Sequence, residues 1–133
     1  MAVELVFAVP SFLLLLLLVA GGGNWVSAEG QVGGAARDAA RAASIARDGD
    51  QATSAATLAA DEDLGTSCTG GTPTVQVQYI GGGGTFATAD DISVTVGCSI
   101  NLAVFKAVGL DASRPFTSVS IAPLDPFTER TDT

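Results

Sequence analysis

The chain begins with a long apolar segment that differs from everything after it. Residues 5–28 contain no charged side chain, and residues 13–18 are all leucine. As an α-helix these 24 residues would extend about 36 Å, which is enough to cross the hydrocarbon core of a bilayer. Trp25 lies near the far end, where an amphipathic ring suits a membrane–water interface. The pattern predicts a transmembrane helix within residues 1–28.

Two kinds of residue weaken the helix within this segment. Pro10 lacks a backbone N–H and therefore removes one helical hydrogen bond. The glycines at positions 21–23 each cost about 1 kcal/mol relative to alanine in a helix interior. We therefore expect the helix to be bent or locally melted at these glycines.

A cleaved secretory signal is the competing interpretation of the same segment. Residues 26–28 have the small-x-small form that signal peptidases prefer, so cleavage after Ala28 would release the rest of the chain. Two features favour a membrane anchor instead. The segment starts with Glu4 rather than with positive residues, and it is longer than the apolar core of a typical signal.

Small apolar residues then recur at spacings of three and four, which is the period of an α-helix. The residues on this stripe are Val32, Ala35, Ala36, Ala39, Ala42, Ala43 and Ala46. Alanines allow helices to approach closely, and we expect residues 29–65 to form an alanine-rich helical segment. Gly49 should interrupt the helix, and Gly65 should end a second short helix that begins near Gln51.

From about residue 66 the pattern changes to alternation between apolar and polar residues, which is typical of strands packed on one face. The apolar positions are Val75, Val77 and Tyr79, then Ile92, Val94, Val96 and Cys98, and finally Val119 and Ile121. We predict a small domain over residues 66–133 with three antiparallel strands. Pro115, Pro123 and Pro126 should limit the last strand.

The two connections of this sheet differ in composition. Residues 81–84 are glycines and predict a flexible hairpin loop; Thr85 and Phe86 follow them where a phosphate-binding loop would need Lys-Ser/Thr. Residues 102–110 are mostly apolar, and we expect a short helix there that covers the sheet.

Cys68 precedes the first predicted strand and Cys98 lies on the apolar side of the second. A disulfide between them would close a loop of about 30 residues and contribute roughly 3–4 kcal/mol in the chain-entropy treatment. Such a bond requires the domain to lie outside the cytoplasm, and two free buried thiols are the alternative.

The overall composition argues against several functions. The chain has 14 acidic and 6 basic residues and a net charge of −8, so we expect no nucleic-acid partner. Histidine is absent, which removes the commonest general base and transition-metal ligand. The acidic run Asp61, Glu62 and Asp63 lacks the spacing of a calcium loop. We therefore expect neither an enzyme nor a cofactor or metal site.

The first 47 residues also show a resemblance to a known family. Residues 2–10, which read Ala-Val-Glu-Leu-Val-Phe-Ala-Val-Pro before the leucines, are similar to the N-terminal signature of the TadE-like family, and residues 34–43 are similar to its post-membrane helix. TadE-like proteins are pilin-like components of the tight-adherence (Flp) type IV pilus system, made as prepilins and cut after a glycine just before the apolar helix. The resemblance implies a pilin-like α+β fold, in which a long N-terminal transmembrane helix continues into the alanine-rich helix and a small three-stranded antiparallel sheet follows. Since no basic leader or glycine precedes Met1, it implies either a start upstream of Met1 or a chain that is not processed.

The resemblance implies a role in assembly, as a minor pilin or pseudopilin. Glu4 would be the pilin glutamate, which can pair with the terminal amine of a neighbouring subunit and fix the axial register. Residues 5–19, with Leu5, Phe7 and Pro10 among them, would carry subunit contacts. The positions implied for close helix packing are Ala35, Ala39, Ala42, Ala43 and Ala46.

The implied partners are other pilin subunits, the pilus assembly machinery and the lipid bilayer. The implied location is the cytoplasmic membrane, with a single pass and the C-terminal domain outside the cytoplasm. A secreted acidic binding module, released by cleavage after Ala28, is the alternative from a different class of function.

Overall fold

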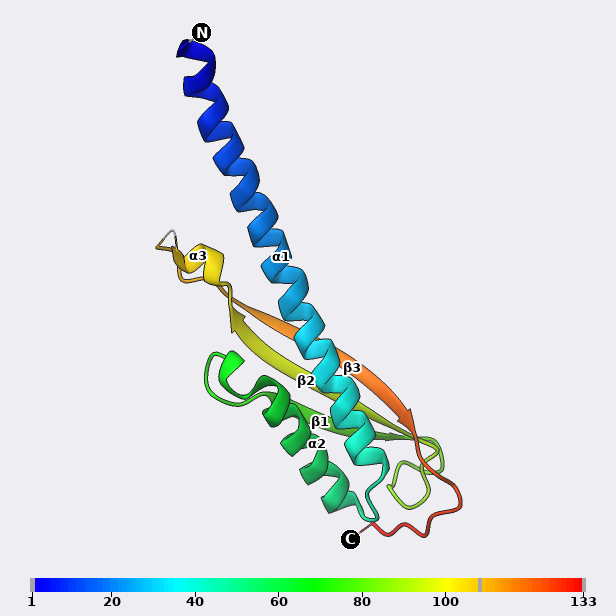
Figure 1. The fold of residues 1–133 in the computed structure, drawn as a ribbon. Coiled ribbons are helices and arrows are strands. Elements are labelled where there is room, and N and C mark those ends of the chain that lie inside the picture. The colour runs from blue at the N-terminus through cyan, green and yellow to red at the C-terminus, as the bar shows by residue number, and fades with distance from the viewer. Residues whose placement is uncertain (1, 108, 133) are drawn as a thin grey trace.

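The spine of the molecule is one helix, α1 (Ala2–Ser44), whose N-terminal half extends beyond the rest of the chain (Figure 1). The computed structural model describes residues 2–107 and 109–132. At 1.5 Å per residue, the 43 residues of α1 extend about 65 Å. The helix passes through Pro10 and residues 21–23 without a break, so the predicted local melting is wrong.

Cooperative helix formation explains this continuity. Three glycines cost roughly 3 kcal/mol in all, but elongation of an existing helix adds one hydrogen bond for each residue that it fixes. The leucines at 13–18 extend the helix on one side of the glycines, and packing from Ala28 onward holds it on the other. Residues 28 and 29, where the sequence divides the anchor from the alanine-rich segment, lie inside this one helix.

A turn at residues 45–48 reverses the chain into α2 (Gly49–Leu64), which packs along the C-terminal half of α1 (Figure 1). Asp48 caps α2, because its carboxylate accepts a hydrogen bond of 2.7 Å from the backbone N–H of Gln51. The expected interruption therefore falls just before Gly49, and this glycine begins the second helix. A Cβ at Gly49 would lie 3.3 Å from the Tyr79 hydroxyl oxygen. Gly65 follows the end of α2, as predicted.

The short 3-10 helix η1 (Gly65–Ser67) leads into a sheet with the order β1 (Thr74–Ile80), β2 (Asp91–Asn101) and β3 (Ser113–Pro123). Both strand pairs are antiparallel, so the predicted α+β class and three-stranded sheet are confirmed. Pro115 lies inside β3, where it pairs with Ser99, and an edge strand tolerates this because it bonds to one neighbour only. Pro123 ends the strand.

The two helices cover one face of this sheet, and β3 presents to them the face opposite to the one predicted. The alternation predicts that Val119 and Ile121 point toward the core, but they are 59% and 60% exposed. The strand residues that pair with the buried apolar positions of β2 are Ser118, Ser120 and Ala122. These small side chains lie where α1 passes over β3: a Cβ at Gly33 would lie 3.8 Å from the Ser118 hydroxyl oxygen, which is an ordinary van der Waals distance.

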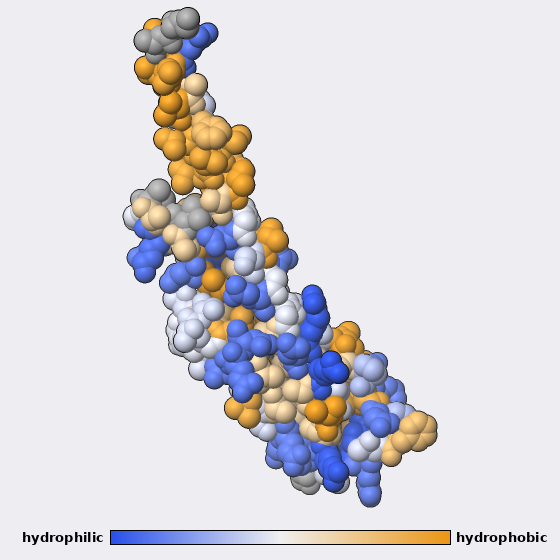
Figure 2. Space-filling model, in the orientation of Figure 1, coloured by the Kyte–Doolittle hydropathy of each residue, from blue (hydrophilic) through white to orange (hydrophobic). Residues whose placement is uncertain are grey.

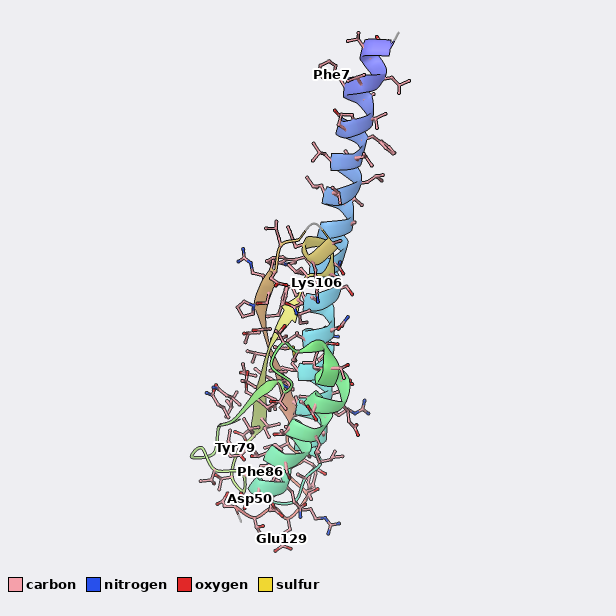
Figure 3. All side chains as sticks on the ribbon, turned by 90° about the vertical axis from the view of Figure 1, so that its left-hand side faces the viewer. Phe7, Asp50, Tyr79, Phe86, Lys106 and Glu129 are labelled. Carbon is pink, nitrogen blue, oxygen red and sulfur yellow. A yellow bond between two sulfur atoms is a disulfide. The ribbon has the colours of Figure 1, made fainter. Side chains whose placement is uncertain are left out.

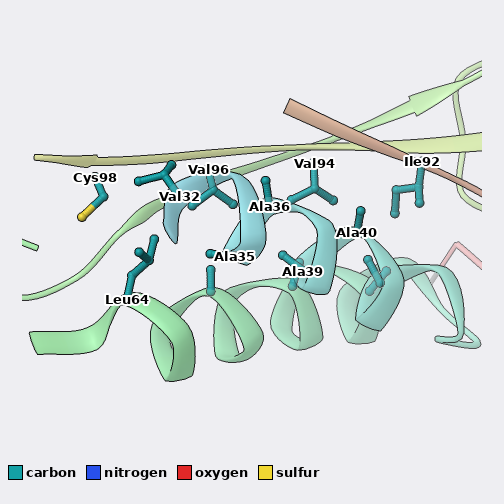
Figure 4. Packing of buried hydrophobic residues seen from close by; sticks show 14 of the residues in the cluster. Val32, Ala35, Ala36, Ala39, Ala40, Leu64, Ile92, Val94, Val96 and Cys98 are labelled. Atoms are coloured by element: carbon teal, nitrogen blue, oxygen red, sulfur yellow. The ribbon is translucent and has the colours of Figure 1, made fainter. Parts of the chain in front are cut away.

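The core is built from alanines on the helices, together with Val32 of α1 and Leu64 of α2, and from the larger side chains of β2 (Figure 4). Buried alanines on α1 and α2 are Ala35, Ala36, Ala39, Ala40, Ala43, Ala52, Ala56 and Ala60. Ile92, Val94 and Val96 extend from β2 toward α1, which lies between the sheet and α2 (Figure 4). Because the distance between packed helices depends on the side chains at their contact, these alanines bring α1 and α2 close together.

Candidate functional site

The N-terminal half of α1 is an apolar surface that the rest of the chain leaves uncovered. Its large hydrophobic side chains between Val3 and Val19 are 47% to 77% exposed, and they form the apolar column seen in Figure 2. Among the described residues, α1 is the one helix that is long and apolar enough to cross a membrane. We call residues 3–19 the apolar surface of α1. Such a surface is stable only when lipid or other protein chains cover it.

The four residues that the sequence assigns to assembly all lie on this part of α1. Glu4 is exposed in the first turn, where the helix dipole favours a negative charge. Leu5 and Phe7 are 66% and 71% exposed, and Figure 3 shows Phe7 on the isolated part of the helix. Pro10 lies one turn further on and is also exposed. The structure thus places these side chains where a neighbouring molecule can reach them.

The alanines assigned to helix packing have a partner within the chain. Ala35, Ala39 and Ala43 are buried in the core, and Ala42 and Ala46 are partly buried. The helix that packs against them is α2 of the same chain. These positions therefore hold the globular part together, and the surface that α1 offers to other molecules lies nearer its N-terminus.

Trp25 joins the apolar surface of α1 to the sheet. Its ring packs edge-to-face on Phe116 of β3, with the ring centroids 5.3 Å apart and the planes at 71°. The Arg114 guanidinium carbon lies 5.7 Å from the centroid of the Trp25 ring, within the range of a cation–π contact. An aromatic residue and a cation thus meet where the helix leaves the sheet.

The connection between β2 and β3 lies beside α1 and does not cover the sheet, so the predicted position of its helix is wrong. The helix is α3 (Ala103–Ala107), and it packs against α1. The two form an apolar groove of about 740 Å³, lined on α1 by Leu14, Leu17, Leu18, Gly21, Gly22 and Trp25 and on the connection by Leu102, Phe105, Leu110, Ala112 and Arg114. Val108, which the sequence places in this helix, lies outside the described residues. The apolar composition of residues 102–110 predicts that they pack against another apolar surface, but it does not distinguish α1 from the sheet.

Cys68 and Cys98 form the predicted disulfide, with their Cα atoms 5.4 Å apart. Cys68 also makes an isolated antiparallel bridge to Ile100 of β2, and the backbone N–H of Thr69 donates to the Ser99 carbonyl at 2.6 Å. The segment after α2 is thereby fixed to the central strand, covalently and through its backbone.

The C-terminal residues fix the glycine-rich loop, which the sequence patterns did not indicate. The Arg130 guanidinium donates to the carbonyl oxygens of Phe86 and Ala89, both at 3.1 Å, and lies 5.6 Å from the centroid of the Phe86 ring. The Asp132 carboxylate accepts a 2.8 Å hydrogen bond from the Ala87 N–H. Within the loop, Gly82 adopts a φ of +53°, and a Cβ there would collide with the Thr88 carbonyl. The C-terminal residues therefore hold the part of the loop that follows the four glycines.

The acidic run at the end of α2 lies at the surface. Asp61, Glu62 and Asp63 are exposed, and no group of three or more His, Cys, Asp or Glu side chains among the described residues is arranged to hold a metal ion. Although the Asp63 side chain is exposed, partial desolvation of its carboxyl, followed by the negative charge of Asp38 on α1, raises its pKa above the ordinary value. This pair is a site of repulsion between the two helices.

Comparison with known proteins finds a match in the N-terminal part of the chain, which contains the apolar surface of α1. Residues 1–41 match the family model described as TadE-like protein. No curated protein and no solved structure matches the chain. The matched region covers the apolar surface of α1, Trp25 and most of the buried alanines of the same helix. The resemblance to TadE-like proteins that the sequence indicates is therefore confirmed over residues 1–41.

Proposed function

We propose that this protein is a membrane-anchored minor pilin or pseudopilin that takes part in the assembly of a tight-adherence pilus. The observation that carries the proposal is the apolar surface of α1, which is uncovered in the isolated chain and coincides with the TadE-like match. In the membrane, lipid would cover this surface. In a pilus, the same residues of neighbouring subunits would cover it, so one helix serves both states.

Glu4 is the residue through which we expect assembly to be directed. A carboxylate at the start of an apolar helix is costly in lipid unless it is paired. Pairing with the terminal amine of a neighbouring subunit would lower this cost only when two helices are in one axial register. The partners in this proposal are therefore other pilin subunits and the machinery that assembles them.

We further propose that the globular part lies outside the cytoplasm. The Cys68–Cys98 disulfide supports this orientation, because disulfides persist in oxidising compartments. The match to TadE-like proteins is consistent with a structural role, and we propose no catalytic one.

Substitution of Glu4 tests the proposal directly. In a strain that depends on this protein for pili, Glu4→Ala should leave the protein in the membrane fraction and reduce piliation to a small fraction of the wild-type level. Glu29→Ala is the matched control, because it removes an exposed acidic side chain from the same helix beyond the apolar segment. Wild-type piliation in the Glu4→Ala strain would remove Glu4 from the assembly mechanism.

The alternative function, a secreted module released after Ala28, predicts a different mature protein. Cleavage there would remove Trp25, which packs on Phe116, and would cut α1 where Ala28 is only 4% exposed. These contacts favour retention of the apolar segment. The N-terminal sequence and intact mass of the protein from membranes and from culture medium distinguish the two: a soluble species that starts at Glu29 would support release and contradict the anchor.

A further inference from the structure

The β2–β3 connection reaches along α1 toward its N-terminus, into the part of the helix that is assigned to the membrane. Its groove with α1 is lined by Leu14, Leu17 and Leu18 on the helix side. Figure 1 shows α3 beside α1 at the point where the helix leaves the sheet, and Figure 3 places Lys106 at the same level. The connection therefore overlaps the apolar segment of α1 and does not stop short of it.

The length of the apolar segment sets the depth of this overlap. A hydrocarbon core of about 30 Å takes up about 20 helical residues. Counted from Leu5, where the uncharged segment begins, such a span ends close to Trp25. Leu14, Leu17 and Leu18 then lie within the hydrocarbon, and the connection, which lines the same groove, lies at the membrane surface or in its outer part on the side of the globular part.

The side chains of the connection suit that position. Phe105 and Leu110 are 39% and 60% exposed in the isolated chain, and both line the groove. Lys106 is exposed on α3, and Arg114 lies at the start of β3 beside Trp25. Asp111 is the acidic residue of this region, so these three charged side chains leave one net positive charge in a chain whose net charge is −8. Apolar side chains flanked by long cationic ones are typical of segments that lie in a bilayer interface.

We propose that the β2–β3 connection is a second membrane contact. Phe105 and Leu110 insert into the outer part of the hydrocarbon beside α1, and Lys106 binds the phosphate groups of anionic lipids. This inference rests on the membrane anchoring in the proposed function. It adds that the second contact fixes the tilt and rotation of the globular part relative to the membrane. The connection would have to leave the lipid when a subunit passes from the membrane into a pilus.

Tryptophan fluorescence of the full chain in lipid vesicles tests the proposal, because Trp25 is the only tryptophan in the sequence. In a Trp25→Phe background, Phe105→Trp, Phe12→Trp and Phe127→Trp place single probes on the connection, in the apolar surface of α1 and in the C-terminal segment. Phe127 is 95% exposed and serves as the water control. The vesicles contain phosphatidylcholine and phosphatidylglycerol, with a spin-label quencher on the upper part of the acyl chain, and acrylamide is the quencher in water.

The proposal expects the lipid quencher to reduce the emission of the probes at positions 105 and 12 and to leave the emission of the probe at position 127 unchanged. Acrylamide should quench position 127 alone. Lipid quenching at position 12 without lipid quenching at position 105 would leave the anchor standing and overturn the second contact. In that case acrylamide quenching at position 105 would show that the connection lies in water, and protection from both quenchers would show that another copy of the chain covers it. Absence of lipid quenching at position 12 would overturn the anchor itself.

The role of Lys106 has a separate readout. Lys106→Glu in the Trp25→Phe, Phe105→Trp background reverses the charge beside the probe, and it should weaken lipid quenching at position 105 in the anionic vesicles. Unchanged quenching would exclude Lys106 from headgroup binding. The signal at position 12 should stay the same in either case, because that probe depends on α1 alone.

Discussion

The edge-to-face contact between Trp25 and Phe116, with ring centroids 5.3 Å apart, holds the sheet against α1 at the level where the helix is expected to leave the membrane. Trp25 belongs to the segment that sequence reasoning assigns to the membrane, whereas Phe116 belongs to β3. The aromatic pair therefore adds to the core packing of α1 from Ala28 onward in fixing the orientation of the sheet on this helix.

Removal of this contact should weaken the attachment of the sheet to α1. Trp25→Ala should lower the free energy of unfolding by about 2 kcal/mol, since it combines the loss of an aromatic pair worth roughly 0.5–1.5 kcal/mol with lost apolar burial. Trp25→Phe keeps a ring at the contact and should cost less than half as much. Urea denaturation of the full chain in detergent, followed by far-UV circular dichroism, measures both. Equal stability of all three proteins would show that the pair does not support the fold.

Close packing of α1 against α2 should make the buried alanines intolerant of larger side chains. Ala39 is fully buried, so Ala39→Leu forces the two helices apart and should destabilise the protein by about 1–3 kcal/mol. Ala42→Leu is the matched control, because Ala42 is partly exposed and the added side chain can turn toward solvent. Thermal denaturation of the two variants gives the comparison. A stability loss at Ala42 as large as at Ala39 would contradict the packing described here.

Reduction of the disulfide should destabilise the globular part substantially. The bond joins residues separated by 30 positions, and a loop of this length corresponds to about 3–4 kcal/mol in the chain-entropy treatment. The Cys68→Ala, Cys98→Ala double variant should match the reduced wild type in denaturant midpoint, and both should unfold at lower denaturant than the oxidised protein. If the oxidised and reduced forms unfolded together, the core alone would be sufficient for stability.

Stability should also depend on the charge of Asp63. Burial and the nearby Asp38 carboxylate raise the pKa of Asp63, so the folded protein binds a proton there more tightly than the unfolded chain does. By linkage, the free energy of unfolding then decreases as pH rises from the ordinary pKa of the carboxyl through its raised value. Asp63→Asn should remove this decrease and be more stable than the wild type at neutral pH. Asp38→Asn should act in the same direction through the lost repulsion. A steeper pH dependence in either variant would contradict the assignment.

The local elements could be predicted from the sequence because their signals are local. The spacing of apolar residues predicts the two longer helices and the three strands. Gly65 follows the end of α2 because a glycine suits a helix terminus. The chain has only two cysteines, so one disulfide was the pairing to expect. The N-terminal residues alone also indicated the TadE-like resemblance, which the family match confirms over residues 1–41.

Tertiary packing decided the features that no local pattern contains. β3 turns the small side chains of Ser118 and Ser120 toward α1, so Val119 and Ile121 face out although their alternation is correct. Residues 21–23 remain helical because the helix is held on both sides of them. The β2–β3 connection meets α1 and not the sheet, and Arg130 reaches back to the loop at Phe86. The spacing of hydrophobic residues predicts which side chains are buried, but the steric fit between whole helices and strands determines the surface that buries them.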